Sequence, residues 1–149
     1  MKKFWLGAFG VLFAINASAA VNGLAVKESK YGVNRTMERL EKALQAKGMT
    51  LFALINHSAE AEKVGMKMRP TQLLIFGNPK GGTRLMNAAP TVAIDLPMKA
   101  IVWQGPKGHV WLAYNTMEYL KTRHDIKGMG QLIGKLDGML DTVTNQVVN

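Results

Sequence analysis

The sequence predicts a single small domain of the α+β class. The chain has 149 residues, the length of one domain, and 48% of them are hydrophobic, enough for one compact core. Short apolar runs typical of strands are interspersed with stretches of helical periodicity. The chain has no cysteine, which excludes disulfides, thiolate nucleophiles, iron–sulfur clusters and cysteine-based zinc sites.

Residues 1–19 have the pattern of a secretory signal peptide. Lys2 and Lys3 precede an apolar run over 4–15, and Ala17-Ser18-Ala19 fits the A-x-A cleavage rule. The apolar run is about twelve residues long, shorter than the ~20 that a transmembrane helix needs. We therefore expect cleavage near Ala19 and an exported protein, periplasmic or secreted, without a transmembrane segment.

The chain is basic, with 19 Lys and Arg against 10 Asp and Glu, a formal charge of +9. The basic residues are scattered rather than clustered, so no nucleic-acid partner is expected. Anionic lipid, a glycan or an acidic protein is the electrostatically favoured partner. Alternatively, the excess of positive charge only keeps the protein soluble.

The first half of the mature chain predicts two strands and two helices. A strand is expected over 24–31, followed by Asn34 as the N-cap of a helix over 35–47. Gly48 suits the left-handed residue that ends this helix. The apolar run over 49–56 predicts a buried strand. Polar residues end this strand, and Ser58 among them is expected to cap a short helix over 59–65.

The second half predicts a glycine-rich turn at 77–83, a helix over 84–89 and a final pair of helices. Four further strands are expected over 71–76, 91–97, 98–104 and 109–114, the last two joined by a hairpin loop at 105–108. Asn115 and Glu118 have the spacing of a capping box and predict a helix over 117–124.

The C-terminal residues 127–149 predict an amphipathic helix. Apolar residues recur there at steps of three and four: Leu132, Leu136, Met139, Leu140, Val143 and Val147. Gly130, Gly134 and Gly138 recur at every fourth position and form a ridge without side chains, which permits close approach of another element. This predicts either a partner contact or a frayed tail, because each glycine also costs a helix roughly 1 kcal/mol.

Four segments of the chain resemble the domain of unknown function 302 family. They are 36–57, 73–86, 93–104 and 110–124, and they occur in family order. The resemblance covers about residues 24–126 and implies helices packed on one face of a mostly antiparallel sheet. It also implies a homodimer, because some members associate as dimers. The family's activity is unassigned, so the resemblance brings no catalytic residues with it.

The glycine-rich segment at 77–83 is the first candidate ligand site. It lacks the spacing of a phosphate-binding P-loop, because Lys80 precedes the glycines. Exposed backbone N–H groups in such a turn can still bind an anion, with Asn78, Lys80, Gly81 and Thr83 as the contacts. The alternative is a tight turn that needs glycine for its backbone angles.

Asp95 is the second candidate, because it lies inside an apolar run and a buried carboxylate needs a partner. Lys80, Arg84 or Lys99 is expected to supply that partner, in a structural ion pair or at a working site. Tyr114 is expected near the same ligand site.

The function predicted from these residues is a non-catalytic module that binds a small molecule or a protein partner. No serine-hydrolase motif, metal-ligand spacing or paired carboxylate is present, and no cofactor is expected. The alternative is a hydrolase or isomerase that uses His57 or Asp95 as acid or base. A further alternative is Cu(I) binding by Met66 and Met68, because thioethers select soft Cu(I); the competing explanation is that methionine fills irregular cores.

Overall fold

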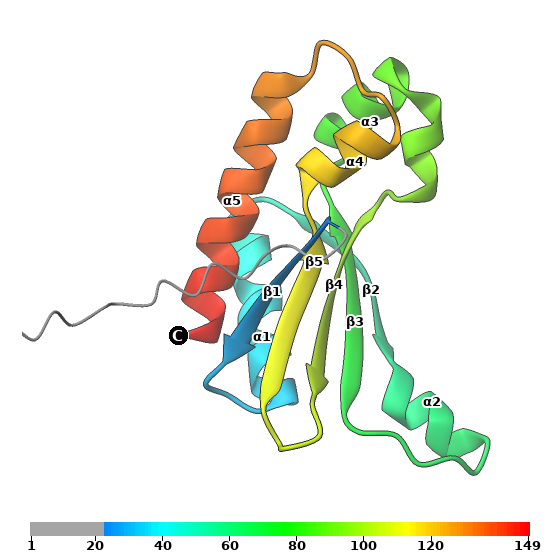
Figure 1. Ribbon diagram of the computed structural model, residues 1–149, viewed down its shortest axis with the longest axis vertical. Coiled ribbons are helices and arrows are strands. Elements are labelled where there is room, and N and C mark those ends of the chain that lie inside the picture. The colour runs from blue at the N-terminus through cyan, green and yellow to red at the C-terminus, as the bar shows by residue number, and fades with distance from the viewer. Residues whose placement is uncertain (1–22) are drawn as a thin grey trace, which may run out of the picture.

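The computed structural model describes residues 23–149, so the expected signal peptide at 1–19 lies outside the described residues. One antiparallel sheet runs through the domain in the order β1-β5-β4-β3-β2 (Figure 1). Its strands are β1 Leu24–Ser29, β2 Thr50–Asn56, β3 Thr71–Gly77, β4 Met98–Gln104 and β5 Val110–Asn115. The predicted α+β class is confirmed.

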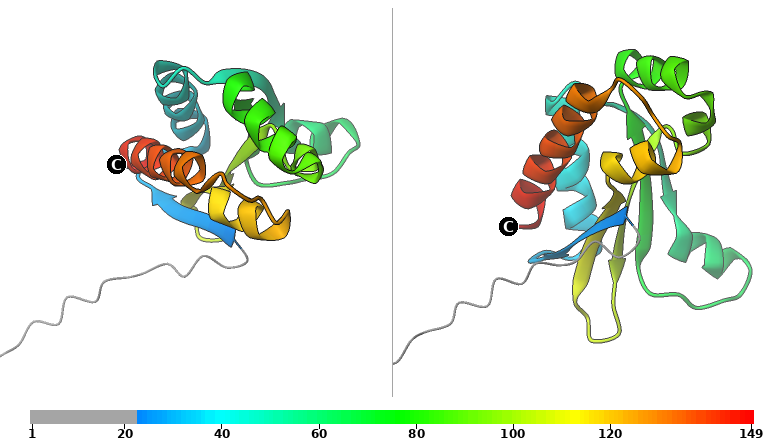
Figure 2. Two further views of the ribbon diagram at one scale, coloured as in Figure 1. Left: turned by 90° about the horizontal axis from the view of Figure 1, so that it is seen from above. Right: turned by 45° about the horizontal axis from the view of Figure 1, so that its top comes forward.

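The helices occupy one face and both ends of this sheet. They are α1 Val33–Ala46, α2 His57–Lys63, α3 Pro79–Ala88, the 3₁₀ helix η2 Pro90–Ile94, α4 Met117–Arg123 and α5 Gly130–Val148. The long helices α1 and α5 pack against each other and against the sheet. Figures 1 and 2 show α3, η2 and α4 at one end of the strands, with α2 at the other.

The alternation of side chains along each strand separates the two faces of the sheet. Toward α1 and α5, Leu74, Phe76 and Leu112 are at most 1% exposed. On the opposite face, Trp103 and Trp111 are paired in register and remain partly exposed. The core therefore lies between the sheet and the long helices.

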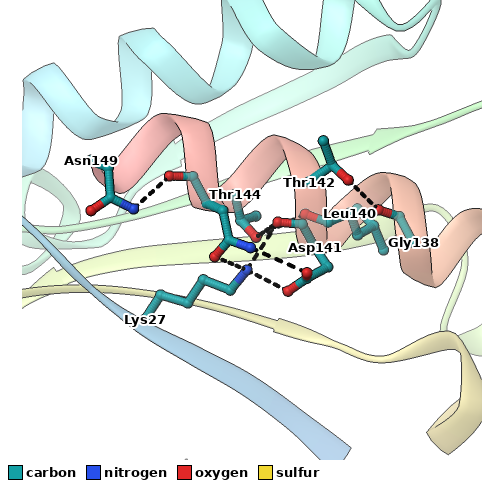
Figure 3. A network of polar contacts seen from close by, with 8 residues as sticks. Lys27, Gly138, Leu140, Asp141, Thr142, Thr144 and Asn149 are labelled. Atoms are coloured by element: carbon teal, nitrogen blue, oxygen red, sulfur yellow. Dashed lines mark hydrogen bonds and ion pairs between the residues drawn. The ribbon is translucent and has the colours of Figure 1, made fainter. Parts of the chain in front are cut away.

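Helix α5 is part of this core, so the frayed-tail alternative is wrong. Ile133, Leu140 and Val143 on its inner face are at most 1% exposed. Lys27 of β1 also ties the helix to the sheet edge (Figure 3). Its Nζ donates to the backbone oxygen of Asp141 at 3.0 Å, to Asp141 Oδ1 at 2.7 Å and to Asn145 Oδ1 at 2.8 Å.

The glycine ridge of α5 faces away from the rest of the described chain. A Cβ placed on Gly130, Gly134 or Gly138 would meet no atom within 4 Å. The ridge thus supports no packing inside the domain, and its predicted partner contact stays a prediction. None of the described helices is both long and apolar enough to cross a bilayer.

Two predicted elements are wrong. Residues 91–97 form η2 and the turn after it, rather than a strand, because Pro90 suits a first helical turn and β4 already fills the place between β3 and β5. The segment 77–83 is not a turn either: Gly77 ends β3, Asn78 is the N-cap, and residues 79–83 form the start of α3. Its glycines do not have positive φ angles, whereas Gly48 does, with φ of +74°, as predicted for the end of α1.

Strand β2 forms as predicted but is not buried. It is one of the two edge strands of the sheet, so it has a neighbour on one side only, and Phe52 and Leu54 are 52% and 48% exposed. The predicted N-caps are each displaced by one or two residues. The sequence predicts Asn34, Ser58 and Asn115, whereas the N-caps in the structure are Gly32, Asn56 and Thr116.

Candidate functional site

A pocket of about 270 Å³ lies where α3, the η2–β4 connection, α4 and α5 meet. Most of its lining is apolar: Phe52, Gly77, Asn78, Pro79, Gly81, Gly82, Thr83, Leu85, Met86, Leu96, Pro97, Met98, Met117 and Leu136. Concave apolar sites with a few polar groups are the usual form of small-molecule sites, whose volumes start at roughly 300 Å³. This pocket is thus suited to a small apolar molecule.

Asn78 lines the pocket and is the N-cap of α3. Its Oδ1 accepts hydrogen bonds from the backbone N–H groups of Lys80 at 3.0 Å and Gly81 at 3.3 Å. Its Nδ2 donates to the backbone oxygen of Gly48 at 3.4 Å. The two N–H groups are therefore already satisfied, which argues against the predicted anion site at this segment.

The helical glycines of α3 leave room in the pocket. A Cβ on Gly82 would lie 3.9 Å from Met86 Cε and 4.0 Å from Leu96 Cδ1, and one on Gly81 would meet nothing within 4 Å. Any larger side chain at Gly82 would extend toward these lining residues. At these two positions glycine leaves space in the pocket, and it is not required by the backbone angles.

Helices α4 and α5, which each supply one residue of the pocket lining, are joined by a polar contact. The Asp137 carboxylate accepts from the N–H groups of Met117 at 2.6 Å and Glu118 at 3.0 Å. Thr116 Oγ1 accepts from the Tyr119 N–H at 3.2 Å, so three N-terminal donors of α4 are bound. Because Met117 and Leu136 both line the pocket, Asp137 joins two of its walls.

Asp95 lies outside the pocket lining, in a cluster between η2 and α4. Its Oδ2 is 2.5 Å from His124 Nε2 and 3.3 Å from Arg123 Nε. The expected partners were wrong, since neither Lys80 nor Arg84 contacts this carboxylate, and Lys99 donates to the backbone oxygen of Asp95 instead.

The cluster extends through His124 to a hydroxyl group. His124 Nδ1 lies 3.1 Å from Thr91 Oγ1, and the His124 side chain is only 6% exposed. The Tyr119 hydroxyl accepts a hydrogen bond from Arg123, and this bond, with the nearby Asp95, raises the pKa of the Arg123 guanidinium. The cluster joins α4 to η2 by polar contacts.

Tyr114 is not part of the pocket either. It is 5% exposed on the face of β5 that is turned toward the helices. Burial raises the pKa of its hydroxyl above 10.0, although a hydrogen bond with Thr144 opposes the shift.

The structure thus brings together only part of the predicted site. Asn78, Gly81 and Thr83 line the pocket, whereas Lys80, Asp95 and Tyr114 do not. His57 begins α2 at the other end of the sheet, so it does not share a cleft with Lys80 or Asp95. Sequence reasoning missed Met117, Leu136 and His124, because no local motif signals a contact between separate helices.

No metal centre is evident within residues 23–149, where no group of three or more His, Asp or Glu side chains is arranged to bind an ion. Met66 and Met68 lie in the connection after α2 and are 66% and 48% exposed. They do not fill the core. Cu(I) binding by this pair stays a prediction.

The chain is similar to part of two longer proteins. The chain is 39% identical over 110 residues to proteins named fluoride-specific ion channel FluC 1 of Brucella suis and Brucella abortus. These 110 residues are 74% of this chain but only 43% and 41% of those proteins, so the match spans about two fifths of their length.

A solved structure has the same fold. An uncharacterized conserved DUF302 protein from Bacillus stearothermophilus superimposes with a TM-score of 0.76 at 20% identity, covering 85% of this chain and 98% of that one. The family model for the domain of unknown function DUF302 matches residues 25–143, which extends the earlier resemblance through most of α5. The chain belongs to the DUF302 family.

Proposed function

We propose that this domain is a non-catalytic binding module whose ligand is a small apolar molecule held in the pocket at α3. The pocket itself carries the proposal, because it is concave and mostly apolar and is lined by side chains from several different elements. Asn78 and Thr83 supply the few polar groups, and Gly81 and Gly82 supply the space.

Filling the pocket tests this function. Gly82→Leu adds a side chain toward Met86 and Leu96 at a helical position, so it should occupy the ligand's volume without breaking α3. Native mass spectrometry of the protein from its host should show a ligand mass that is lost in Gly82→Leu. Gly134→Leu is the matched control, since Gly134 is also a helical glycine with an open environment. Equal ligand occupancy in the parent protein, Gly82→Leu and Gly134→Leu would refute the proposal.

We propose further that the protein is exported after cleavage near Ala19 and acts as a homodimer. The sheet face with the partly exposed residues Leu73, Ile101, Trp103 and Trp111 supports the dimer, because neighbouring apolar side chains that remain partly exposed are a common feature of interfaces. Ile101→Glu should convert a dimer to a monomer in analytical ultracentrifugation. N-terminal sequencing of the protein from its host tests the cleavage.

A hydrolase is the second candidate function, and the contacts of His124 favour it. The Asp95 carboxylate orients His124 so that Nδ1 can accept the proton of the Thr91 hydroxyl, as a general base does for a nucleophile. A fluorophosphonate probe should then label Thr91 and leave His124→Gln unlabelled. A protein that is not labelled would exclude this candidate.

A further inference from the structure

The connection between α2 and β3 carries the densest group of exposed apolar side chains at the end of the sheet remote from the pocket. We call residues 63–70 the α2–β3 arm, which extends beyond the sheet in Figure 1. Val64, Met66 and Met68 are 72%, 66% and 48% exposed. Three large apolar side chains within five residues leave substantial apolar surface in water, and such surface typically marks an interaction site.

The charges of the arm are all positive. It contains Lys63, Lys67 and Arg69 and no acidic residue. Lys63 is paired with Glu60 at 2.7 Å. Across residues 23–149, no carboxylate lies within ion-pair distance of Lys67 or Arg69. The arm therefore presents two uncompensated cations beside its apolar residues and is complementary to an anionic partner.

The two cations also border a concavity. Lys67, Met68 and Arg69 line a shallow groove of about 700 Å³ together with Thr71, Trp103 and Gln104. Trp103 is paired in register with Thr71, so the groove lies where the arm returns to the sheet. Phosphate is attracted by such cations, and tryptophan is enriched where proteins meet the headgroup region of a bilayer.

The backbone at the tip of the arm is already hydrogen-bonded. The N–H groups of Val64 and Met66 bind the Ala61 oxygen at 3.2 and 2.9 Å, and that of Gly65 binds the Glu62 oxygen at 3.0 Å. Gly65 has φ of +75°, which permits this closing turn after α2. The N–H groups of residues 64–66 can therefore leave bulk water without becoming unsatisfied donors, whose burial in lipid is costly.

We propose that the α2–β3 arm docks on an anionic phospholipid surface. Val64, Met66 and Met68 enter the boundary between headgroups and acyl chains, and Lys67 and Arg69 bind lipid phosphates at the groove. An anionic bilayer offers both properties that the arm requires, negative charge at its surface and an apolar interior beneath it. This surface is separate from the ligand pocket. Trp103 also lies on the sheet face proposed for the dimer, so the lipid contacts are assigned to the residues of the arm and not to Trp103.

Vesicle flotation tests the proposal. The chain from Ala20 onward, which contains every described element, is mixed with vesicles of phosphatidylcholine alone or with added phosphatidylglycerol. Binding is expected only where phosphatidylglycerol is present. Lys67→Gln with Arg69→Gln should lower the partition coefficient roughly 25-fold, because each cation near an anionic surface contributes about fivefold. Met66→Gln with Met68→Gln should lower it at least about tenfold, because the inserted apolar surface is lost.

Two control variants match these changes away from the arm. Lys42→Gln with Lys47→Gln removes the same charge from exposed positions at and after α1. Ile94→Gln removes an apolar side chain that is 75% exposed on η2. Both should bind vesicles as the parent protein does. All these side chains are exposed, so thermal melting should be nearly unchanged and loss of folding should not confuse the comparison.

Three results would overturn the proposal. The parent protein could fail to bind vesicles that contain phosphatidylglycerol. The α1 charge variant could lose as much binding as the arm charge variant, which would indicate a general effect of net charge. Finally, millimolar inorganic phosphate could displace the protein while the methionine variant binds normally, which would indicate a site for a free anion rather than a lipid surface.

Discussion

Asp137 should stabilise the domain by joining α5 to the start of α4, and Asp137→Ala measures that contribution. The Met117 N–H is partly buried, so losing its 2.6 Å bond to the carboxylate costs about 1–2 kcal/mol. The Glu118 N–H is exposed and can bind water after the substitution, so its bond contributes roughly 0.5–1 kcal/mol. The better helix propensity of alanine returns about 0.5 kcal/mol. The expected net loss is about 2 kcal/mol.

Urea denaturation of Asp137→Ala beside the parent protein checks this value. The same loss should lower Tm by about 6–10 °C for a domain of this size. Hydrogen exchange should be faster at the amides of Met117 and Glu118, because only these donors lose their acceptor. Glu41→Ala is the control, since Glu41 is a helical acid on α1 of similar exposure. Equal stability of the two variants, or unchanged exchange at both amides, would show that the Asp137 contact does not hold α4.

Three further predictions concern single positions. Gly23→Ala should destabilise the domain by more than about 2 kcal/mol in urea titration, because its φ is +83° and a Cβ would lie 2.2 Å from the Tyr119 ring; unchanged stability would contradict this packing. Gly134→Ala with Gly138→Ala should instead raise stability by about 1–2 kcal/mol, since both are helical glycines in open space; a loss of dimer in sedimentation would mean that the glycine ridge is an interface. Tyr114→Phe should reduce the loss of stability at alkaline pH. The raised folded-state pKa of Tyr114 means that its neutral form contributes stability that is complete below pH 10.0 and is lost as the pH rises through the higher folded value. Identical alkaline melting curves for both proteins would exclude that contribution.

The helices and strands that could be predicted from the sequence are those whose local pattern of apolar residues fits only one kind of secondary structure. The face of Met37, Leu40 and Leu44 fits only an amphipathic helix, and all three are at most 2% exposed in α1. The apolar run of residues 71–76 likewise forms β3, which has a neighbour on each side. In these places, local periodicity and tertiary packing favour the same structure.

The wrong predictions concern segments whose sequence pattern fits two different structures equally well. Asn78, Pro79 and two glycines suit either a tight turn or the capped start of a helix, and the contact of Asn78 with Gly48 belongs only to the folded chain. The apolar residues of β2 suit a central or an edge strand equally well, and strand order decides between them. The sequence predicts that Asp95 needs a partner, but His124 lies 29 residues away along the chain and no spacing rule connects the two.

Strand β3 separates the ligand pocket from the α2–β3 arm and makes these two proposals independently testable. It begins at Thr71 beside the groove of the α2–β3 arm and ends at Gly77 in the pocket lining. Seven residues of antiparallel strand span about 20 Å, so neither surface reaches the other. Substitutions at Lys67 and Arg69 should therefore leave pocket occupancy unchanged, and Gly82→Leu should leave vesicle binding unchanged. If one of these substitutions abolished both kinds of binding, the pocket and the arm would have to be coupled through the sheet, and a lipid would become the candidate ligand of the pocket.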